Sequence, residues 1–254
     1  MSVLHCLLLV PVIASAEDQE LAGLFSQVGV KGTIIIAPLQ GAGVFVHDEQ
    51  RSRQRFPVAS TFKILNTLIA LEEGAISDGD ELRWDGISRE IADWNHNQTL
   101  ESAFRTSCVW CFQDLARKVG ATKYESYLSA VAYGELKRPF EETRFWLDGS
   151  LKASAAEQVT LLKQIYHRSL PFRNSSYETL RRIMLVEQTA QYSIRAKTGW
   201  ATSTYPQIGW YVGYVETTKG NWFFALNLDV RTQSELPLRQ KITRDALHAK
   251  GIIQ

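Results

Sequence analysis

The apolar residues of this chain change their spacing twice, and that order limits the possible folds more than any other feature. Strand-type runs occur near the start at 33–37 and 43–46, separated by the turn Gly41-Ala42-Gly43. Helical spacing then dominates, and strand-type runs return at 192–197, 208–216 and 222–228. We therefore expect a sheet built from both ends of the chain, with helices inserted between its early and late strands.

The segments with helical apolar spacing are 60–73, 100–119, 122–131, 154–167, 176–187 and, after the late strands, 238–249. This order predicts an α/β (α+β) fold in which an antiparallel sheet is flanked by helices and carries an inserted all-helical subdomain. The 254 residues suit one domain of two closely packed lobes. We expect a mixed sheet lobe over about 17–56 and 188–254, a helical lobe over about 57–187, and a site in the cleft between them.

The first residues predict an export signal. An apolar run at 3–13 precedes Ala14-Ser15-Ala16, a small-x-small cleavage pattern. No Lys or Arg precedes the run, so a buried N-terminal helix is the alternative. Because the run is too short for a membrane span, we expect removal of residues 1–16 and a periplasmic protein starting near Glu17, without a transmembrane helix.

The charge balance and the histidines exclude several functional classes. The formal net charge is +1, so no strong field favours nucleic acid or an acidic membrane. The basic residues at 51, 53 and 55 fit a solvated edge. The pattern predicts neither a metal site nor a His–Asp arrangement, since the histidines outside the export signal are scattered. They are His47, His96, His167 and His248.

Ser60 and Lys63 are the first candidates for chemistry. They lie three residues apart at the start of a predicted helix, so their side chains share one face. A serine hydroxyl needs an adjacent base to be a nucleophile, and a lysine must be desolvated to serve as that base. Apolar neighbours such as Phe62 and Leu65 would provide that setting. On its own the match is weak, because a helix-capping serine beside a solvated lysine gives the same pattern.

Two further elements strengthen the interpretation. Ser107-Cys108-Val109 lies in the helical middle, and Lys197-Thr198-Gly199 ends a predicted strand. The order Ser-x-x-Lys, Ser-x-Val, Lys-Thr-Gly is similar to the triple signature of penicillin-recognising serine enzymes. Several other segments make the sequence resemble the class D (oxacillinase-type) β-lactamases, over a span from about residue 20 to the end. They are Pro57 before Ser60, Trp84-Asp85-Gly86, Tyr133-Gly134, Phe145-Trp146-Leu147-Asp148-Gly149, Trp200 after Gly199, and Leu236-Pro237-Leu238-Arg239.

The resemblance implies roles around the nucleophile. Ser60 would attack the β-lactam carbonyl and become acylated. Lys63 would carry a carboxyl group taken from carbon dioxide or bicarbonate (N6-carboxylysine) and act as the general base. Trp146 would donate its indole N–H to that group, and Phe62, Val109 and Leu147 would wall the pocket. No other cofactor is implied.

The resemblance also implies how the substrate is held. Ser107 would pass a proton to the lactam nitrogen, assisted by Lys197. Thr198 and Arg239 would bind the substrate carboxylate, and Gly199 would belong to the same binding edge. The backbone N–H groups of Ser60 and Trp200 would form the oxyanion hole.

Three features depart from the family pattern or vary within it. Glu135 follows Tyr133-Gly134 where asparagine is common, and it could alter the loop over Lys63. Cys108 and Cys111 replace simpler apolar residues; we expect buried thiols, because a disulfide inside a helix would be strained and a redox pair would need to follow a strand. The short stretch 200–209 resembles that of members that accept carbapenems.

The predicted function is hydrolysis of β-lactam antibiotics, conferring resistance, with a small-molecule β-lactam as partner and neither nucleic acid nor membrane. One alternative is a D,D-peptidase that releases penicillin slowly. A second is the sensor domain of a β-lactam receptor, which would need membrane helices and an effector that this sequence has no room for. The sequence leaves a monomer and a homodimer open.

Overall fold

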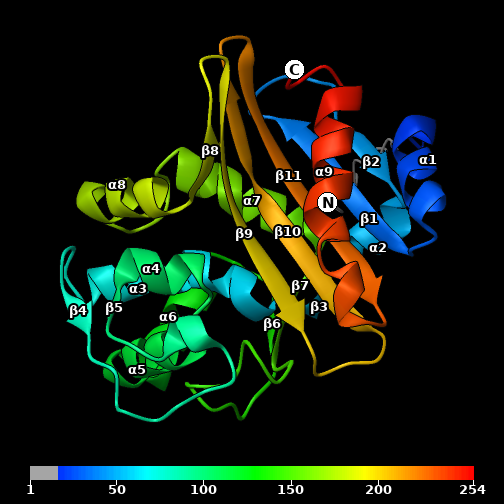
Figure 1. Ribbon diagram of the computed structural model, residues 1–254. Helices are drawn as coiled ribbons and strands as arrows, with labels where there is room; N and C mark the ends of the chain where they lie inside the picture. Colours follow the sequence, from blue (N-terminus) through cyan, green and yellow to red (C-terminus); the bar gives the residue numbers. More distant parts are fainter. Residues whose placement is uncertain (1–16) are drawn as a thin grey trace, which may run out of the picture.

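The fold is built on an antiparallel sheet to which both ends of the chain contribute. The computed structural model describes residues 17–254 (Figure 1), so the predicted export signal lies outside the described residues. The six strands follow the order β2-β1-β11-β10-β9-β8. They are β1 (Gly32–Pro38), β2 (Phe45–His47), β8 (Leu185–Gln188), β9 (Tyr192–Ala201), β10 (Gln207–Thr217) and β11 (Gly220–Val230). Early β1 pairs with late β11, Ile34 opposite Leu226, which confirms the predicted fold class.

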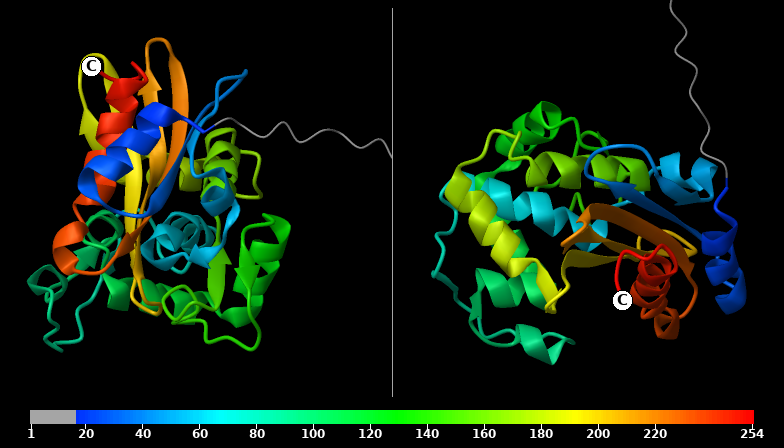
Figure 2. Two further views of the ribbon diagram at one scale, coloured as in Figure 1. Left: turned by 90° about the vertical axis from the view of Figure 1, so that its right-hand side faces the viewer. Right: turned by 90° about the horizontal axis from the view of Figure 1, so that it is seen from above.

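Helices cover both faces of this sheet (Figures 1 and 2). On one face lie α1 (Gln19–Val28) and α9 (Leu238–Ala249), which share a buried apolar cluster with the strands. On the other face α7 (Ala155–Tyr166) crosses β1, β10 and β11. Every residue of β1 is buried, as expected for a strand with helices on both sides.

The remaining helices form the inserted region, centred on α3 (Lys63–Glu72). The 3₁₀ turn η1 (Ala59–Phe62) leads into α3, and the residues from Lys63 to Leu71 are all buried. Around α3 lie α4 (Leu100–Arg105), α5 (Val109–Val119), α6 (Ala121–Ala130) and α8 (Asn174–Ile183). The smaller elements are α2 (Glu49–Arg53), β3 (Phe56–Pro57), β4 (Glu81–Leu82), η2 (Ala92–Trp94), β5 (Gln98–Thr99), β6 (Glu135–Leu136), β7 (Leu151–Ala153) and η3 (Gln233–Glu235).

Two predicted helices are wrong in extent. The helix expected over 100–119 is broken, because Ser107 adopts a left-handed conformation with φ 57° and separates α4 from α5. The helix expected over 176–187 ends at Ile183, because the next residues form β8 and extend the sheet beside β9. Helix α1, whose N-terminus is capped by the side chain of Asp18, is not predicted from the sequence.

Within residues 17–254, none of the helices has the length and apolar character needed to cross a membrane.

Candidate active site

Ser60 lies in η1, at the junction between the sheet and the inserted helices. The residue before it, Ala59, has φ 47°, an uncommon conformation for a non-glycine residue. Buried hydrogen bonds hold this turn: the Trp210 indole N–H donates to the Pro57 carbonyl at 2.8 Å, and the Thr61 hydroxyl donates to the Val58 carbonyl at 2.6 Å. The role of Trp210 is not predictable from the sequence, because it depends on the contact between strand β10 and η1.

Lys63 opens α3 and is fully buried, and among the described residues it is the one lysine whose amine forms a hydrogen bond with the Ser60 hydroxyl. Its Nζ donates to Ser60 Oγ at 3.2 Å and lies 4.9 Å from the centre of the Phe112 ring. Burial lowers the pKa of this ammonium from 10.5 to about 7. A large share of the amine is therefore neutral at pH 7, so Lys63 can accept a proton or act as a nucleophile.

Trp146 is fully buried and packs its ring 5.9 Å from that of Phe62, the residue before Lys63. Its indole N–H has no hydrogen-bond partner among residues 17–254. A buried donor without an acceptor costs about 1–3 kcal/mol, so the unpaired indole N–H of Trp146 requires an explanation. Leu147 follows it and is half-buried, as is Val109 at the start of α5.

Ser107 and Lys197 form a second serine–lysine pair. The break between α4 and α5 presents Ser107, and Lys197 Nζ on β9 donates to its Oγ and to the Thr198 carbonyl, the latter at 3.1 Å. Lys197 is buried, and its pKa lies well below the ordinary value because of burial and repulsion from Lys63 and Arg239. The predicted Ser107–Lys197 proximity is thus present, although the two residues are far apart in sequence.

The end of β9 forms an open edge beside η1. The N–H of Ala196 donates to the Met184 carbonyl, away from β10, at 2.9 Å. Alternate residues of an antiparallel strand point the same way, so the N–H of Trp200 also faces this edge. Gly199 makes the close approach possible, since a Cβ there would lie only 3.0 Å from Thr61 Cγ2.

Arg239, near the start of α9, reaches across the sheet to this edge. Its Nη1 donates to the Gly199 carbonyl at 2.6 Å, and burial lowers its pKa to about 10. Gly209 gives it room, because a Cβ there would lie 2.9 Å from Arg239 Cδ. Gly209 belongs to none of the sequence motifs, so its role in making space for Arg239 is evident only from the packing.

Three basic side chains meet at the site without a carboxylate partner among residues 17–254. Across the described part of the chain, the hydrogen-bond partners of Lys63, Lys197 and Arg239 are hydroxyl and carbonyl oxygens, and none of the three forms an ion pair with a carboxylate. Arg239, with a pKa of about 10, carries its positive charge at pH 7, and a buried positive charge without a counter-ion is costly and favours binding of an anion. The arrangement is therefore suited to a substrate that carries a carboxylate.

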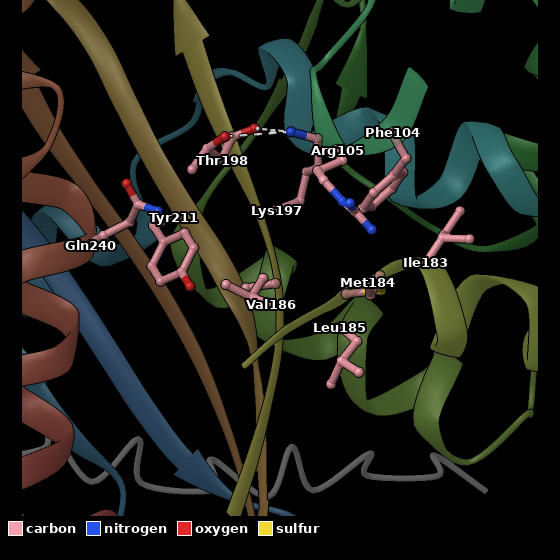
Figure 3. Close-up of a pocket in the computed structure, with 11 residues that line it drawn as sticks. Phe104, Arg105, Ile183, Met184, Leu185, Val186, Lys197, Thr198, Tyr211 and Gln240 are labelled. Carbon is pink, nitrogen blue, oxygen red and sulfur yellow. Dashed lines mark hydrogen bonds between the residues drawn. The ribbon is translucent and has the colours of Figure 1, made fainter. Parts of the chain in front are cut away.

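A pocket of about 480 Å³ adjoins this charge (Figure 3). Lys197 and Thr198 are among the residues that line it, and the close-up shows their hydrogen-bonded contact. The other residues that line it are Phe104, Arg105, Ile183, Met184, Leu185, Val186, Ala196, Tyr211 and Gln240. The pocket extends the open edge of β9 towards the end of α4.

Glu135, the departure from the family pattern, faces solvent. Its side chain is 70% exposed and pairs with Arg55 at 3.0 Å, which also binds Glu157 at 2.6 Å. Exposed pairs of this kind contribute at most about 1 kcal/mol. The charge of Glu135 is therefore directed to the surface and meets Arg55 there.

Cys108 and Cys111 form a disulfide, so the expectation of two free buried thiols is wrong. The reason is the helix break: Cys108 caps α5 from outside with ψ 112°, and Cys111 lies in the first turn. Their Cα atoms are 5.5 Å apart, within the usual range for a disulfide. The bond joins a cap to a helix instead of lying inside one.

No group of three or more His, Cys, Asp or Glu residues within 17–254 is placed to hold a metal ion.

Comparison with known proteins places this arrangement in a family. Residues 37–248 match the penicillin binding protein transpeptidase domain. The chain is 37% identical to β-lactamase OXA-48 of Klebsiella pneumoniae, over 93% of this chain and 90% of that protein. It is 41% identical to β-lactamase OXA-20 of Pseudomonas aeruginosa, over 92% and 88%.

Solved structures agree with the sequence relatives. The class D β-lactamase YbXI from Nostoc superposes with a TM-score of 0.89 at 40% identity, covering 91% of this chain and 98% of that one. FUS-1 (OXA-85), a class D β-lactamase from Fusobacterium nucleatum subsp. polymorphum, gives a TM-score of 0.90 at 33% identity, over 94% and 100%. The similarity therefore includes the sheet and the inserted helices together.

Proposed function

The chain belongs to the class D serine β-lactamases, and we propose that it hydrolyses β-lactam antibiotics through an acyl-enzyme on Ser60, with Lys63 carboxylated. Hydrolysis of these antibiotics confers resistance. The observation that carries the mechanism is the fully buried Lys63 amine, 3.2 Å from Ser60 Oγ and without a carboxylate partner in the described part of the chain. A buried amine of lowered pKa beside a hydroxyl is the feature that activates a serine.

In acylation, Ser60 Oγ forms a bond to the lactam carbonyl carbon. The Ser60 proton leaves towards Lys63, and negative charge develops on the carbonyl oxygen. The backbone N–H groups of Ser60 and Trp200 receive that charge, and losing one such donor typically costs about 10²–10³ in rate. The C–N bond of the ring then breaks.

Carboxylation of Lys63 fits the residues around it. A neutral, desolvated amine can add to carbon dioxide, and the negative charge gained would offset the excess of positive charge at the site. The Trp146 indole N–H, which is buried and has no partner within 17–254, would gain an acceptor. The carboxyl group, when present, supplies an acid–base pair suited to near-neutral pH beside Ser60 and, after acylation, beside the hydrolytic water.

Ser107 and Lys197 would serve the leaving nitrogen. As the C–N bond breaks, Ser107 gives its proton to the nitrogen and takes one from Lys197, to which it is hydrogen-bonded. A substrate carboxylate bound at Thr198 and Arg239 would raise the pKa of the Lys197 ammonium, because an opposite charge favours the protonated form. Binding of the substrate thus prepares the proton donor.

Replacing Arg239 with alanine is expected to raise KM for benzylpenicillin about 10- to 100-fold while kcat falls less than fivefold. A charge-assisted hydrogen bond to the carboxylate contributes about 1.5–3 kcal/mol, and the carboxylate is bound in both the ground state and the transition state. Steady-state kinetics measures the two constants. Arg239→Lys keeps the charge and should recover part of the affinity. An unchanged KM in Arg239→Ala would remove Arg239 from the binding site.

The dependence on carbon dioxide should follow the Lys63 pKa of about 7. Burial lowers this pKa, so the neutral amine is lost as pH falls through 7, and at pH 5 only about 1% remains. At fixed dissolved carbon dioxide, reactivation of depleted enzyme should slow about tenfold per pH unit below 7. A carbamate signal in ¹³C NMR with labelled bicarbonate gives a readout independent of activity. Absence of that signal at pH 7.5 would exclude carboxylation.

We also propose that carbapenems are among the substrates. The connection between β9 and β10 spans only 202–206, which supports this extension by leaving the open edge of β9 accessible. Hydrolysis of imipenem, followed by absorbance, tests it directly, and turnover of penicillins without turnover of imipenem would restrict the proposal to penicillins.

Export to the periplasm is part of the proposal, supported by the apolar run and cleavage pattern of residues 3–16. The test of function is turnover of a chromogenic cephalosporin in the presence of bicarbonate. We expect many product molecules per enzyme. Acylation that stops at one equivalent would contradict hydrolysis and favour the D,D-peptidase or the sensor.

A further inference from the structure

We propose that the Cys108–Cys111 disulfide is a positioning device for Ser107, holding its hydroxyl against Lys197. The inference rests on the role proposed above for Ser107 as proton donor to the leaving nitrogen. It assigns a function to the cysteine pair that distinguishes this chain from the family pattern. The disulfide would act on acylation through Ser107 without touching the substrate.

Ser107 needs support because its backbone is strained. A non-glycine residue at φ 57° is unfavourable unless its neighbours fix it on both sides. On the α4 side, the N–H of Cys108 donates to the Ala103 carbonyl at 2.9 Å, and the Trp94 indole N–H donates to the Thr106 carbonyl at 3.0 Å. These hydrogen bonds fix the backbone at the C-terminal end of α4, directly before Ser107.

On the α5 side, the cysteine pair provides the support. The Cys108 sulfur accepts a hydrogen bond from the N–H of Cys111 at 3.3 Å, and the disulfide links the same two residues covalently. That first turn of α5 also carries Val109 and Phe112, and the Phe112 ring lies 4.9 Å from Lys63 Nζ. The bond therefore fixes the start of α5 directly after Ser107.

The short spacing of the cysteines indicates a local role. A disulfide between residues three apart closes a very small loop and restricts the unfolded chain little. Both cysteines are fully buried, so a reductant cannot reach them without local opening. A static support for the turn accounts for the bond better than global stabilisation or a redox switch does.

Formation of the bond is a two-electron oxidation. The two thiols lose two protons and two electrons, and a disulfide oxidant such as glutathione disulfide is reduced to two thiols by exchange. Oxidising compartments outside the cytosol provide such oxidants. Export and activity are therefore linked through Ser107.

The test is the double variant Cys108→Ala/Cys111→Val, which keeps the core apolar and removes the bond. In single-turnover experiments with benzylpenicillin, we expect acylation to slow about tenfold and deacylation of the same acyl-enzyme to change less than twofold. A loss of core packing alone would not slow acylation while leaving deacylation unchanged. Val119→Ala, in the last turn of α5, is the matched control for helix destabilisation and should leave both rates within twofold.

A second experiment removes the disulfide without changing any side chain. Wild-type protein made in a reducing cytosol should contain two free thiols in the mature chain and show the same acylation defect. The defect should be reversed when that protein is unfolded and refolded in the presence of glutathione disulfide. Wild-type acylation rates in the double variant or in the reduced protein would overturn the inference. So would two free thiols in protein recovered from an oxidising compartment.

Hydrogen exchange at 106–109 separates this inference from the proposed function. We expect exchange there to rise at least tenfold in the double variant and to stay unchanged in Val119→Ala. If no β-lactam acylates the wild-type protein, the proposed function fails while this exchange measurement still tests the support of Ser107. Unchanged exchange in the double variant would overturn the positioning role on its own.

Discussion

Ser60→Ala is expected to lower kcat/KM for a chromogenic cephalosporin by at least about 10⁴-fold, because no other hydroxyl can take the place of the nucleophile. Ser107 is the nearest alternative in chemistry, but its Oγ is engaged in a hydrogen bond with Lys197. The fold should persist, since Ser60 is only half-buried and makes a single side-chain hydrogen bond, to Lys63.

Spectrophotometric turnover of Ser60→Ala measures the loss, and thermal unfolding provides the control for folding. Penicillin should also fail to label the variant covalently. More than about 1% of wild-type turnover in the folded variant would show that another residue attacks the ring.

Lys63→Met is expected to reduce turnover about 10³-fold or more and at the same time to stabilise the protein. General-base catalysis contributes about 10²–10⁴ in rate, and methionine has no basic group. Burial holds the Lys63 pKa near 7 in the folded state against about 10.5 in the unfolded chain, so the lysine destabilises the fold below pH 7. That penalty is relieved as pH rises from 7 towards 10.5.

The magnitude of this destabilisation follows from the shift in the Lys63 pKa. A pKa lowered from 10.5 to about 7 corresponds to roughly 5 kcal/mol at pH 6. Thermal unfolding at pH 6 should therefore show Lys63→Met melting about 10–20 °C above the wild type, and the difference should shrink at pH 9. Carboxylation of the wild type would reduce the difference, so protein depleted of carbon dioxide is the reference. Normal turnover in Lys63→Met would refute the assigned base.

The sequence predicts the sheet well, because strand and helix periods differ and both ends of the chain show the strand period. It does not reveal the break at Ser107, since Phe104, Cys108, Cys111 and Leu115 keep a helical spacing straight through it. The backbone departs from the helix there by one left-handed residue, which leaves the apolar spacing unchanged. The same continuity conceals the disulfide, whose geometry is possible only because Cys108 lies outside α5.

The residues of the active site also fall into two groups, those predictable from the sequence and those that only the fold reveals. Ser60 and Lys63 are joined by local spacing and are predictable from the sequence. Lys197 meets Ser107 across 90 positions, so that contact follows only from the fold or from family resemblance. Trp210 contributes a buried hydrogen bond to the turn that carries Ser60, and Gly209 leaves space for the Arg239 side chain. Neither has a sequence signal that separates it from ordinary strand residues.

Intact-protein mass spectrometry during turnover tests the central claim most directly. Enzyme in bicarbonate is mixed with benzylpenicillin, quenched within seconds, and analysed beside product formation. We predict an adduct equal to the mass of one whole substrate molecule, because opening of the ring releases no fragment, located on the peptide that contains Ser60. The adduct should disappear as many equivalents of hydrolysed product accumulate. An adduct on another residue, or a permanent adduct with no product beyond one equivalent, would contradict the account.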